Sequence, residues 1–390
     1  MTRADAQIAY LDYNATAPVL PAVVEAMRCV WQLPVNASSV HGFGRKGKQM
    51  LREARKDIAK AIGAQGAEII FTSGGTEANN HSVKAIESID VVMHSSIEHV
   101  SLHNPVKEMT ESGIVKAPYV IPVTGDGVVD VGALSEKLKE LKDSQEITAQ
   151  KFLVSVMLVN NETGVIQPVA EIAQAVYQCG GFMHCDASQA IGKIPVDFTE
   201  LNVDMMTISA HKAGGPQGVG ALVVKRGLHI KPLHFGGGQE RGYRAGTENI
   251  AGICGFAEAL KQIRFPNIVL QKYLEEEIKQ YAPDAIIAGE GAQRIPNTSC
   301  IILNGMSSEL QLMTFDLGGV AVSSGSACSS GKVATSHVLL AMGYSEDLAR
   351  SSIRVSYGER TTEEEIQKFI RLWKKNYDKA RCNIMQDIPA

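Results

Sequence analysis

Short apolar runs alternate along this chain with longer amphipathic stretches. The apolar runs predict buried strands at 68–71, 91–95, 152–159, 182–185, 204–208 and 220–224. Between them, 48–62 and 131–141 repeat apolar side chains at helical spacing, and Gly63 is a plausible stop for the first of these helices. Alternating strands and helices predict an α/β fold with a mainly parallel sheet.

The pattern changes in the last third of the chain. A helix to Tyr281, strands near 299–303, 319–322 and 353–356, and a terminal helix from Glu363 indicate a smaller α+β unit. We place the boundary near Phe265-Pro266-Asn267. We therefore expect a large domain over 16–262 and a small domain formed by 1–15 and 263–390. Residues 110–150 are polar, with a turn at 124–127, and carry no candidate chemistry.

Several predicted strands end in polar residues. In open α/β sheets, ligands bind beyond the carboxyl ends of the strands, so polar side chains at these ends are expected to meet in one cleft. The candidates for this cleft are Asn160, Asp186, Gln189, Ser209, His211 and Lys212.

Two of these strand ends suggest specific chemistry. A partly desolvated Lys212 would lose its proton easily and could hold an aldehyde cofactor, although a solvated lysine in a turn fits the same residues. The turn at 72–80 leads from a strand into a helix, so Gly75 and Thr76 could bind a phosphate. A plain helix N-terminus without a ligand is the alternative.

Two other features are ambiguous or misleading. Gly42, Gly44 and Gly47 match the spacing of a dinucleotide-binding loop, but no predicted strand precedes them, so we reject that interpretation. His99 follows a predicted strand and could be either a loop histidine with its own partners or an aromatic lid on a planar cofactor.

Composition narrows the possible partners and compartments. The chain has 390 residues, of which 45% are hydrophobic and 21% charged, and its formal net charge of -4 provides no field that would attract nucleic acid or an anionic membrane. No apolar stretch approaches the length of a membrane span, and the first residues lack the apolar segment of a secretory signal, so we expect a cytoplasmic protein. The seven cysteines are scattered without a Cys-x-x-Cys pair, which argues against a disulfide framework or structural zinc.

The motifs together resemble those of the cysteine desulfurases, pyridoxal-phosphate enzymes of the class V aminotransferase group. The resemblance extends from about Tyr10 to Tyr357 and is closest to the nitrogen-fixation and iron-sulfur-cluster branch, because the segment around Cys328 is similar to the longer catalytic loop of that branch. It implies the type I fold of pyridoxal-phosphate transferases, with a mainly parallel seven-stranded sheet flanked by helices and a smaller α+β domain. The motifs are SGGTEANN at 73–80, NNETG at 160–164, DASQ at 186–189, SAHK at 209–212 and SGSACSS at 324–330.

The resemblance assigns residues to the cofactor ring. It implies that Lys212 binds the cofactor covalently, that Asp186 faces the pyridine nitrogen, and that His99 stacks on the ring and takes part in catalysis. Asn160 and Gln189 would form hydrogen bonds with the ring hydroxyl. A carboxylate beside the pyridine nitrogen favours the protonated ring and so strengthens its capacity to accept electrons.

The resemblance also assigns the phosphate group. Gly75, Thr76, Ser209 and His211 would hold it through backbone amides, hydroxyls and an imidazole. Thr247 would reach the phosphate of the neighbouring subunit, which implies a homodimer.

The remaining assignments concern the substrate. Arg354, with Asn160, would bind L-cysteine, because a planar guanidinium matches a carboxylate. Cys328 would take the sulfur as a persulfide while L-alanine leaves, with Lys212 as the proton carrier. Its Ser-, Gly- and Ala-rich surroundings are typical of an exposed, mobile loop.

The sulfur would pass to an acceptor such as an iron-sulfur cluster scaffold, or serve the synthesis of another sulfur-containing cofactor. A selenocysteine lyase or a transaminase on the same fold remains the alternative, and a non-catalytic partner protein is a third possibility. This sequence departs from relatives at Ala17 and Ala37. Its tail over 378–390 does not resemble the tail through which relatives dock their scaffold.

Overall fold

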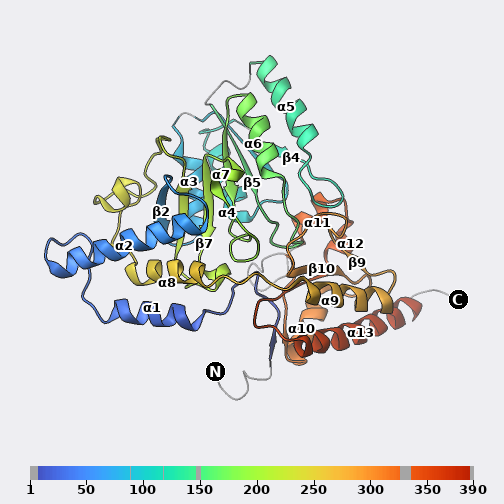
Figure 1. The fold of residues 1–390 in the computed structure, drawn as a ribbon. Helices are drawn as coiled ribbons and strands as arrows, with labels where there is room; N and C mark the ends of the chain where they lie inside the picture. Colours follow the sequence, from blue (N-terminus) through green and yellow to red (C-terminus); the bar gives the residue numbers. More distant parts are fainter. Residues whose placement is uncertain (1–7, 88, 117, 146–150, 326–334, 387–390) are drawn as a thin grey trace.

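A seven-stranded sheet forms the centre of the larger part of the molecule (Figure 1). The computed structural model describes residues 8–87, 89–116, 118–145, 151–325 and 335–386. The strand order is β2-β8-β7-β6-β5-β3-β4, and only β8 runs antiparallel to its neighbours, so the predicted mainly parallel sheet is confirmed. The strands are β2 (Glu68–Thr72), β3 (Val91–Ser95), β4 (Tyr119–Ile121), β5 (Phe152–Met157), β6 (Phe182–Asp186), β7 (Met205–Ser209) and β8 (Gly220–Val224).

Helices cover both faces of this sheet. Along β5, Phe152, Val154 and Val156 pack in one apolar core while Leu153 packs in another, because alternate side chains of a strand point to opposite faces. Helices α2, α5, α6 and α8 contribute to the first core, and α3 and α4 contribute to the second. The helices are α1 (Pro21–Trp31), α2 (Gly42–Ala61), α3 (Gly75–Ala85), α4 (Val100–Glu111), α5 (Val131–Asp143), α6 (Val169–Gln178), α7 (Phe198–Leu201) and α8 (Ile250–Lys261).

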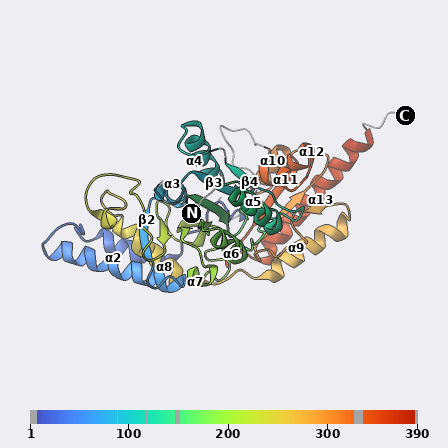
Figure 2. The same cartoon turned by 90° about the horizontal axis from the view of Figure 1, so that it is seen from above.

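The smaller part has its own sheets. An antiparallel sheet has the order β12-β10-β9, and β1 pairs in parallel with β11. Helices α9, α10 and α13 pack around them at the lower right of Figure 1, and Figure 2 shows α2 and α13 at opposite ends of the molecule. The elements are β1 (Ala9–Tyr10), α9 (Ile268–Tyr281), β9 (Ile286–Ile287), β10 (Thr298–Ile302), α10 (Ser308–Leu317), β11 (Val320–Ala321), α11 (His337–Ala341), α12 (Glu346–Ala349), β12 (Ser352–Ser356) and α13 (Glu363–Gln386).

The glycines at 42, 44 and 47 lie in a helix. They occupy the first turns of α2, which begins earlier than the sequence pattern predicts and ends where expected, before Gly63 with its φ of +61°. A Cβ at Gly44 would lie 1.9 Å from the backbone oxygen of Ser39, so close packing explains that glycine. No strand leads into this segment, in agreement with the rejection of a dinucleotide site.

Helix α4 and strand β4 are absent from the sequence prediction. Pro105 lies inside α4 and removes a backbone donor, which masks the helical pattern. The carbonyl of Ser101, four residues earlier, instead accepts a hydrogen bond from Nδ2 of Asn80 at 3.4 Å. Strand β4 has three residues at the edge of the sheet and is partly exposed, so it lacks a continuous apolar run.

One buried acid lies beneath the carboxyl ends of β3 and β5. Oε1 of Glu98 accepts hydrogen bonds from the Ser95 hydroxyl at 2.5 Å and from the Met157 backbone N–H at 2.8 Å. Oε2 has no hydrogen-bond partner among the described residues. Burial, aided by the charge of Asp186, raises the pKa of Glu98 to about 8. The carboxyl group is therefore protonated at neutral pH.

Within the described residues, no helix is both long and apolar enough to cross a bilayer.

Replacement of one ring in the stacked pair Phe315 and Phe369 tests the packing of the smaller part. Their rings lie 4.7 Å apart between centroids, at 11°, and both side chains are fully buried. Phe369→Ala should lower the free energy of unfolding by about 3–5 kcal/mol, through lost burial and a residual cavity. Leu317→Ala is the control, since Leu317 is 83% exposed. Urea unfolding measures both, and equal losses would contradict this packing.

Glu98 predicts a pH dependence of stability. Because its pKa is raised from 4.5 to about 8 in the fold, the folded state binds more protons than the unfolded state between these values. Its contribution to the free energy of unfolding is therefore present below about pH 4.5 and is lost as pH rises toward 8. Glu98→Gln mimics the protonated side chain, so the variant should lose less stability than the wild type between pH 5 and 8. Urea unfolding at several pH values measures both proteins. If their free energies of unfolding change equally between pH 5 and 8, the assignment is refuted.

Candidate active site

A cavity of about 620 Å³ lies beyond the carboxyl ends of β5, β6 and β7. The N-termini of α3 and α4 reach it from the large sheet, and β12 reaches it from the small sheet. Residues from both sheets therefore face one space, as the polar strand ends predict. The candidate residues that line it are Gly75, Thr76, His99, Asp186, Gln189, Ser209, His211, Lys212 and Arg354.

Among the described candidate residues, Asn160 and Thr247 are not part of the cavity lining. Oδ1 of Asn160 accepts hydrogen bonds from the backbone N–H groups of Glu162 and Thr163 at 2.9 and 3.0 Å, so its side chain organises the turn after β5. Thr247 is exposed and lies just before α8. Cys328 lies outside the described residues.

The N-terminus of α3 offers an anion site. Its N-cap, Gly74, provides no side-chain hydrogen bond, so the first N–H groups of the helix lack a capping side chain. A Cβ at Gly75 would lie 2.9 Å from Oγ of Ser188 and 3.7 Å from Cβ of Ser209, so glycine leaves the approach open. Oγ of Ser209 is buried without a partner among the described residues. Free amides, an unpartnered hydroxyl and the positive end of the helix dipole suit a phosphate.

Asp186 ends β6 as a buried carboxylate. Its Oδ2 accepts from Nδ2 of Asn79 at 2.7 Å, and its Oδ1 accepts from the Ser188 backbone N–H at 2.9 Å. Burial alone would raise the pKa of Asp186. The hydrogen bonds from Ser188 and Asn79, with the charge of Lys212, outweigh burial and lower it. Asp186 therefore stays ionised and can face a cationic ring nitrogen.

Lys212 lies in a short 3-10 helix (His211–Ala213) directly after β7. Burial lowers the pKa of its amine, Asp186 opposes this shift and Arg354 adds to it. Burial also lowers the pKa of His211 to about 4, with smaller effects of Lys212 and Lys193. The amine is thus more easily deprotonated than a solvated lysine, as nucleophilic attack on an aldehyde requires.

His99 is the N-cap of α4. Its Nδ1 accepts the Ser101 backbone N–H at 3.1 Å and lies 2.8 Å from the Ser101 hydroxyl oxygen. Burial, with the charge of Lys212, lowers the pKa of His99. The ring is therefore neutral at pH 7 and its orientation is fixed by the helix start, while it lines the cavity.

Arg354 enters the cavity from β12. Its Nη2 donates to Oδ1 of Asp12 at 2.7 Å, and its Nη1 donates to the backbone oxygen of Asn161 at 2.9 Å. Its Nε has no partner among the described residues. The guanidinium is 5% exposed, so its charge acts in a largely dry environment.

The sequence reasoning assigned no role to several other lining residues. Asn79 lies within the 73–80 motif and shares the helical face of Thr76, which was an available signal. Glu162 lies within the 160–164 motif, whereas Asn14 lies in none of the motifs. His337 carried no sequence signal. It reaches the cavity because its Nε2 donates to the backbone oxygen of Glu98 at 2.9 Å.

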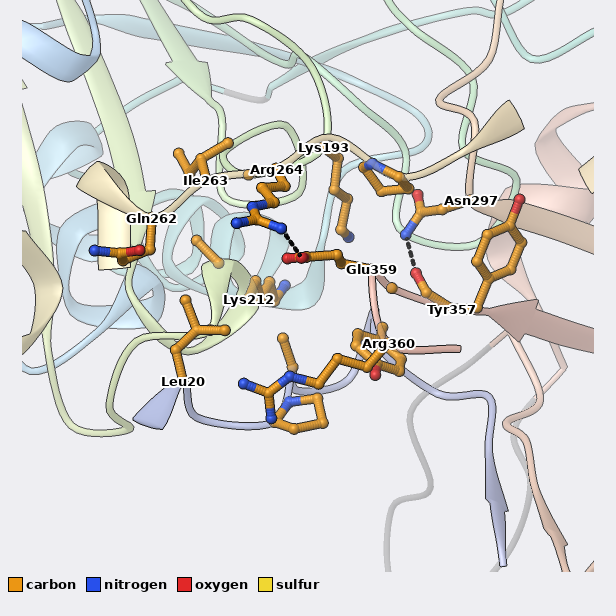
Figure 3. A pocket seen from close by; sticks show the side chains of 18 residues that line it. Leu20, Lys193, Lys212, Gln262, Ile263, Arg264, Asn297, Tyr357, Glu359 and Arg360 are labelled. Atoms are coloured by element: carbon orange, nitrogen blue, oxygen red, sulfur yellow. Dashed lines mark hydrogen bonds and ion pairs between the residues drawn. The ribbon is translucent and has the colours of Figure 1, made fainter. Parts of the chain in front are cut away.

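Lys212 also borders a second, smaller pocket of about 70 Å³ (Figure 3). Lys193 lines this pocket together with Lys212. Nδ2 of Asn297 donates to the backbone oxygen of Tyr357 across it at 2.6 Å, and Arg264 forms an exposed ion pair with Glu359 at 3.1 Å. The amine of Lys212 thus belongs to the wall between two hollow spaces.

The site fits pyridoxal phosphate. An anion site at α3, an ionised carboxylate at Asp186 and the half-buried, easily deprotonated amine of Lys212 correspond to the phosphate, the ring nitrogen and the aldehyde of this cofactor.

Comparison with known proteins agrees with this geometry. The family model of aminotransferase class-V matches residues 9–369. The chain is 39% identical to the cysteine desulfurase IscS of Dictyoglomus turgidum, over 95% of each chain. The solved structure of a NifS-like protein from Rickettsia africae is 36% identical, with a TM-score of 0.85 over 95% of this chain and 99% of that chain. A structure described as SspA in complex with cysteine is 30% identical, with a TM-score of 0.77 over 90% of this chain and 99% of that chain. The chain therefore belongs to the class-V aminotransferase family and, within it, to the group of the cysteine desulfurases.

Proposed function

We propose that this protein is a cysteine desulfurase that converts L-cysteine to L-alanine and transfers the sulfur to its own Cys328. The observation that carries the proposal is the convergence of Lys212, Asp186 and Arg354 on one cavity. Gly325 and Thr335, which flank the segment that contains Cys328, line the same cavity. The similarity to cysteine desulfurases over nearly the whole chain supports the same reaction.

The residues of the large sheet hold the cofactor in this proposal. Gly75, Thr76, Ser209 and His211 bind the phosphate, and Asp186 stabilises the protonated ring. When bound, pyridoxal phosphate supplies an electron sink that stabilises negative charge at the substrate carbon that loses a proton.

The substrate is oriented from the small sheet. Arg354 donates hydrogen bonds to the carboxylate of L-cysteine and so orients the substrate in the cavity that Lys212 also lines. The amine of Lys212 removes the α-proton and later returns a proton to the product, because its lowered pKa makes both directions accessible. His99 remains neutral beside it, so it adds no positive charge that would hinder the protonation of Lys212.

The sulfur step is balanced without an external oxidant. The thiolate of Cys328 attacks the substrate sulfur, a sulfur–sulfur bond forms, and the bond between that sulfur and the substrate β-carbon breaks. The electron pair of the broken bond stays on the carbon, which takes a proton. Sulfur is oxidised as carbon is reduced, which leaves a persulfide on Cys328 and L-alanine as the product.

We also propose a homodimer and a protein acceptor for the sulfur. Thr247 is exposed and lies outside the cavity of its own chain, which supports its assignment to the phosphate of a neighbouring subunit. An iron-sulfur cluster scaffold is the acceptor class that the family suggests.

Replacement of the proposed nucleophile tests the reaction class. Cys328→Ser should abolish alanine and sulfide formation from L-cysteine while the bound cofactor keeps its visible absorption, since no cofactor contact is assigned to this side chain. Cys29→Ser is the control because Cys29 is a free, exposed thiol with no assigned role in the reaction. Undiminished desulfuration by Cys328→Ser would rule out Cys328 as the residue that takes the sulfur. The ratio of turnover of cysteine to that of selenocysteine separates a desulfurase from a selenocysteine lyase.

Replacement of Arg354 tests substrate binding. Arg354→Lys keeps a charge for Asp12 but loses the planar donors, so KM for L-cysteine should rise about 10- to 100-fold with the cofactor retained. Arg350→Lys is the control, because Arg350 is 61% exposed and pairs with Glu346. Steady-state kinetics measures both variants. An unchanged kcat/KM in Arg354→Lys would remove Arg354 from the substrate site.

A further inference from the structure

The side-chain amide of Gln189 has one orientation that satisfies its neighbours. On one side is the backbone oxygen of Asn14, which can only accept, so the atom 3.0 Å away is Nε2 of Gln189. On the other side Nζ of Lys193 donates to Oε1. Both contacts select the same orientation of the amide. Since Gln189 lines the large cavity and is 4% exposed, a reversed amide would leave buried groups unpaired.

Lys193 is buried without an acidic partner. Its side chain is 3% exposed, and among the described residues it forms no ion pair. Its amine donates to Oδ1 of Asn14 at 2.6 Å and to Oε1 of Gln189. Burial lowers the pKa of this amine well below its usual value, nearby Lys212 and Arg354 add to the effect, and the charge of Asp12 opposes it. Protonated or neutral, the amine carries enough N–H groups for both oxygens.

Burial of a lysine amine is costly unless hydrogen bonds compensate for the lost solvent, and here Asn14 and Gln189 accept them. Asn14 is itself fixed from the opposite side, because its Nδ2 donates to Oγ1 of Thr298 at 3.0 Å and its backbone N–H donates to Oγ of Ser356 at 3.0 Å. Lys193 therefore connects a rigid anchor in the small sheet to an amide in the cofactor cavity.

We propose that Lys193 is a positioning residue that fixes the Gln189 amide with its Nε2 toward the cavity. Nε2 carries a second N–H, for which no acceptor occurs among the described residues. Gln189 thus acts as a hydrogen-bond donor to an oxygen of the bound cofactor, never as an acceptor from a hydroxyl. This inference rests on the proposed function, and the resemblance to the cysteine desulfurases, which pairs Gln189 with the ring hydroxyl, identifies that oxygen as the ring oxygen of pyridoxal phosphate.

A donor at this position stabilises the anionic form of the ring oxygen. Loss of the donor makes the oxygen more basic, so the pH at which the visible absorption of the bound cofactor changes should rise. The absorption of the holoenzyme as a function of pH reports this effect directly and requires no desulfuration. Failure of this inference is therefore distinguishable from failure of the proposed function.

The experiment is a double-mutant cycle on the holoenzyme. Lys193→Met and Gln189→Leu should each raise the absorption midpoint by about one pH unit, a tenfold change in proton affinity. The double variant should show no larger shift than either single variant, because Lys193 acts through Gln189. Lys193→Arg retains donors, and the pocket of about 70 Å³ beside Lys193 gives it room, so its midpoint should match the wild type.

Two results would overturn the proposal. The first is a midpoint that moves in Gln189→Leu but not in Lys193→Met. The second is a full sum of the two single shifts in the double variant, which would mean that Lys193 acts independently of Gln189. If Lys193→Met does not fold, Lys193→Leu takes its place in the cycle. Lys231→Met controls for loss of a positive charge alone, since Lys231 is 53% exposed and pairs with Glu87.

Discussion

The ionised carboxylate of Asp186 is the constraint on which the site depends. A buried charge must be compensated, and here Asn79 from α3 and the Ser188 backbone supply the hydrogen bonds. The same contacts hold the N-terminus of α3 beside β6, which leaves its free amides at the cavity. Asp186 also contributes to the raised pKa of Glu98, so two neighbouring acids have opposite protonation states at neutral pH. In the proposed function the ionised Asp186 faces the ring nitrogen, while the protonated Glu98 joins β3 and β5.

A second constraint is that the residues proposed to bind the cofactor and the substrate come from different sheets. Arg354 belongs to β12, whereas Lys212 follows β7. Asn14 bridges the two, since its side chain bonds Thr298 on one side and accepts from Lys193 on the other. The relative placement of substrate and cofactor therefore depends on a few buried polar contacts, which tolerate less change than apolar packing.

The sequence predicted the site best where polar side chains follow the ends of predicted strands. Polar residues after β5, β6 and β7 indicated one cleft, because parallel strands bring their carboxyl ends to one edge. The assignment of Asn160 to the cofactor stays a prediction, since its side chain bonds its own turn and is not among the residues that line the cavity. The sequence reasoning overlooked Lys193 and Asn79, whose partners Asn14 and Asp186 are distant in the chain. Hydrogen bonds between residues that are distant in the chain produce no periodic pattern in the sequence. Helix α4 was overlooked for a local reason, since Pro105 hides it unless the compensating bond from Asn80 is known.

Backbone hydrogen bonds from the segment before α1 fix the loop that carries Lys212. The backbone N–H groups of Ala17 and Leu20 donate to the carbonyls of His211 and Gly214 at 2.9 and 3.0 Å. Gly214 adopts a φ of +75°, and a Cβ there would lie 2.9 Å from Cγ of Leu20, so only glycine permits this close approach. Because backbone bonds fix the loop, the freedom of Lys212 lies in its side chain alone. The two proton transfers proposed for Lys212 require this combination of a fixed backbone and a side-chain amine that can move.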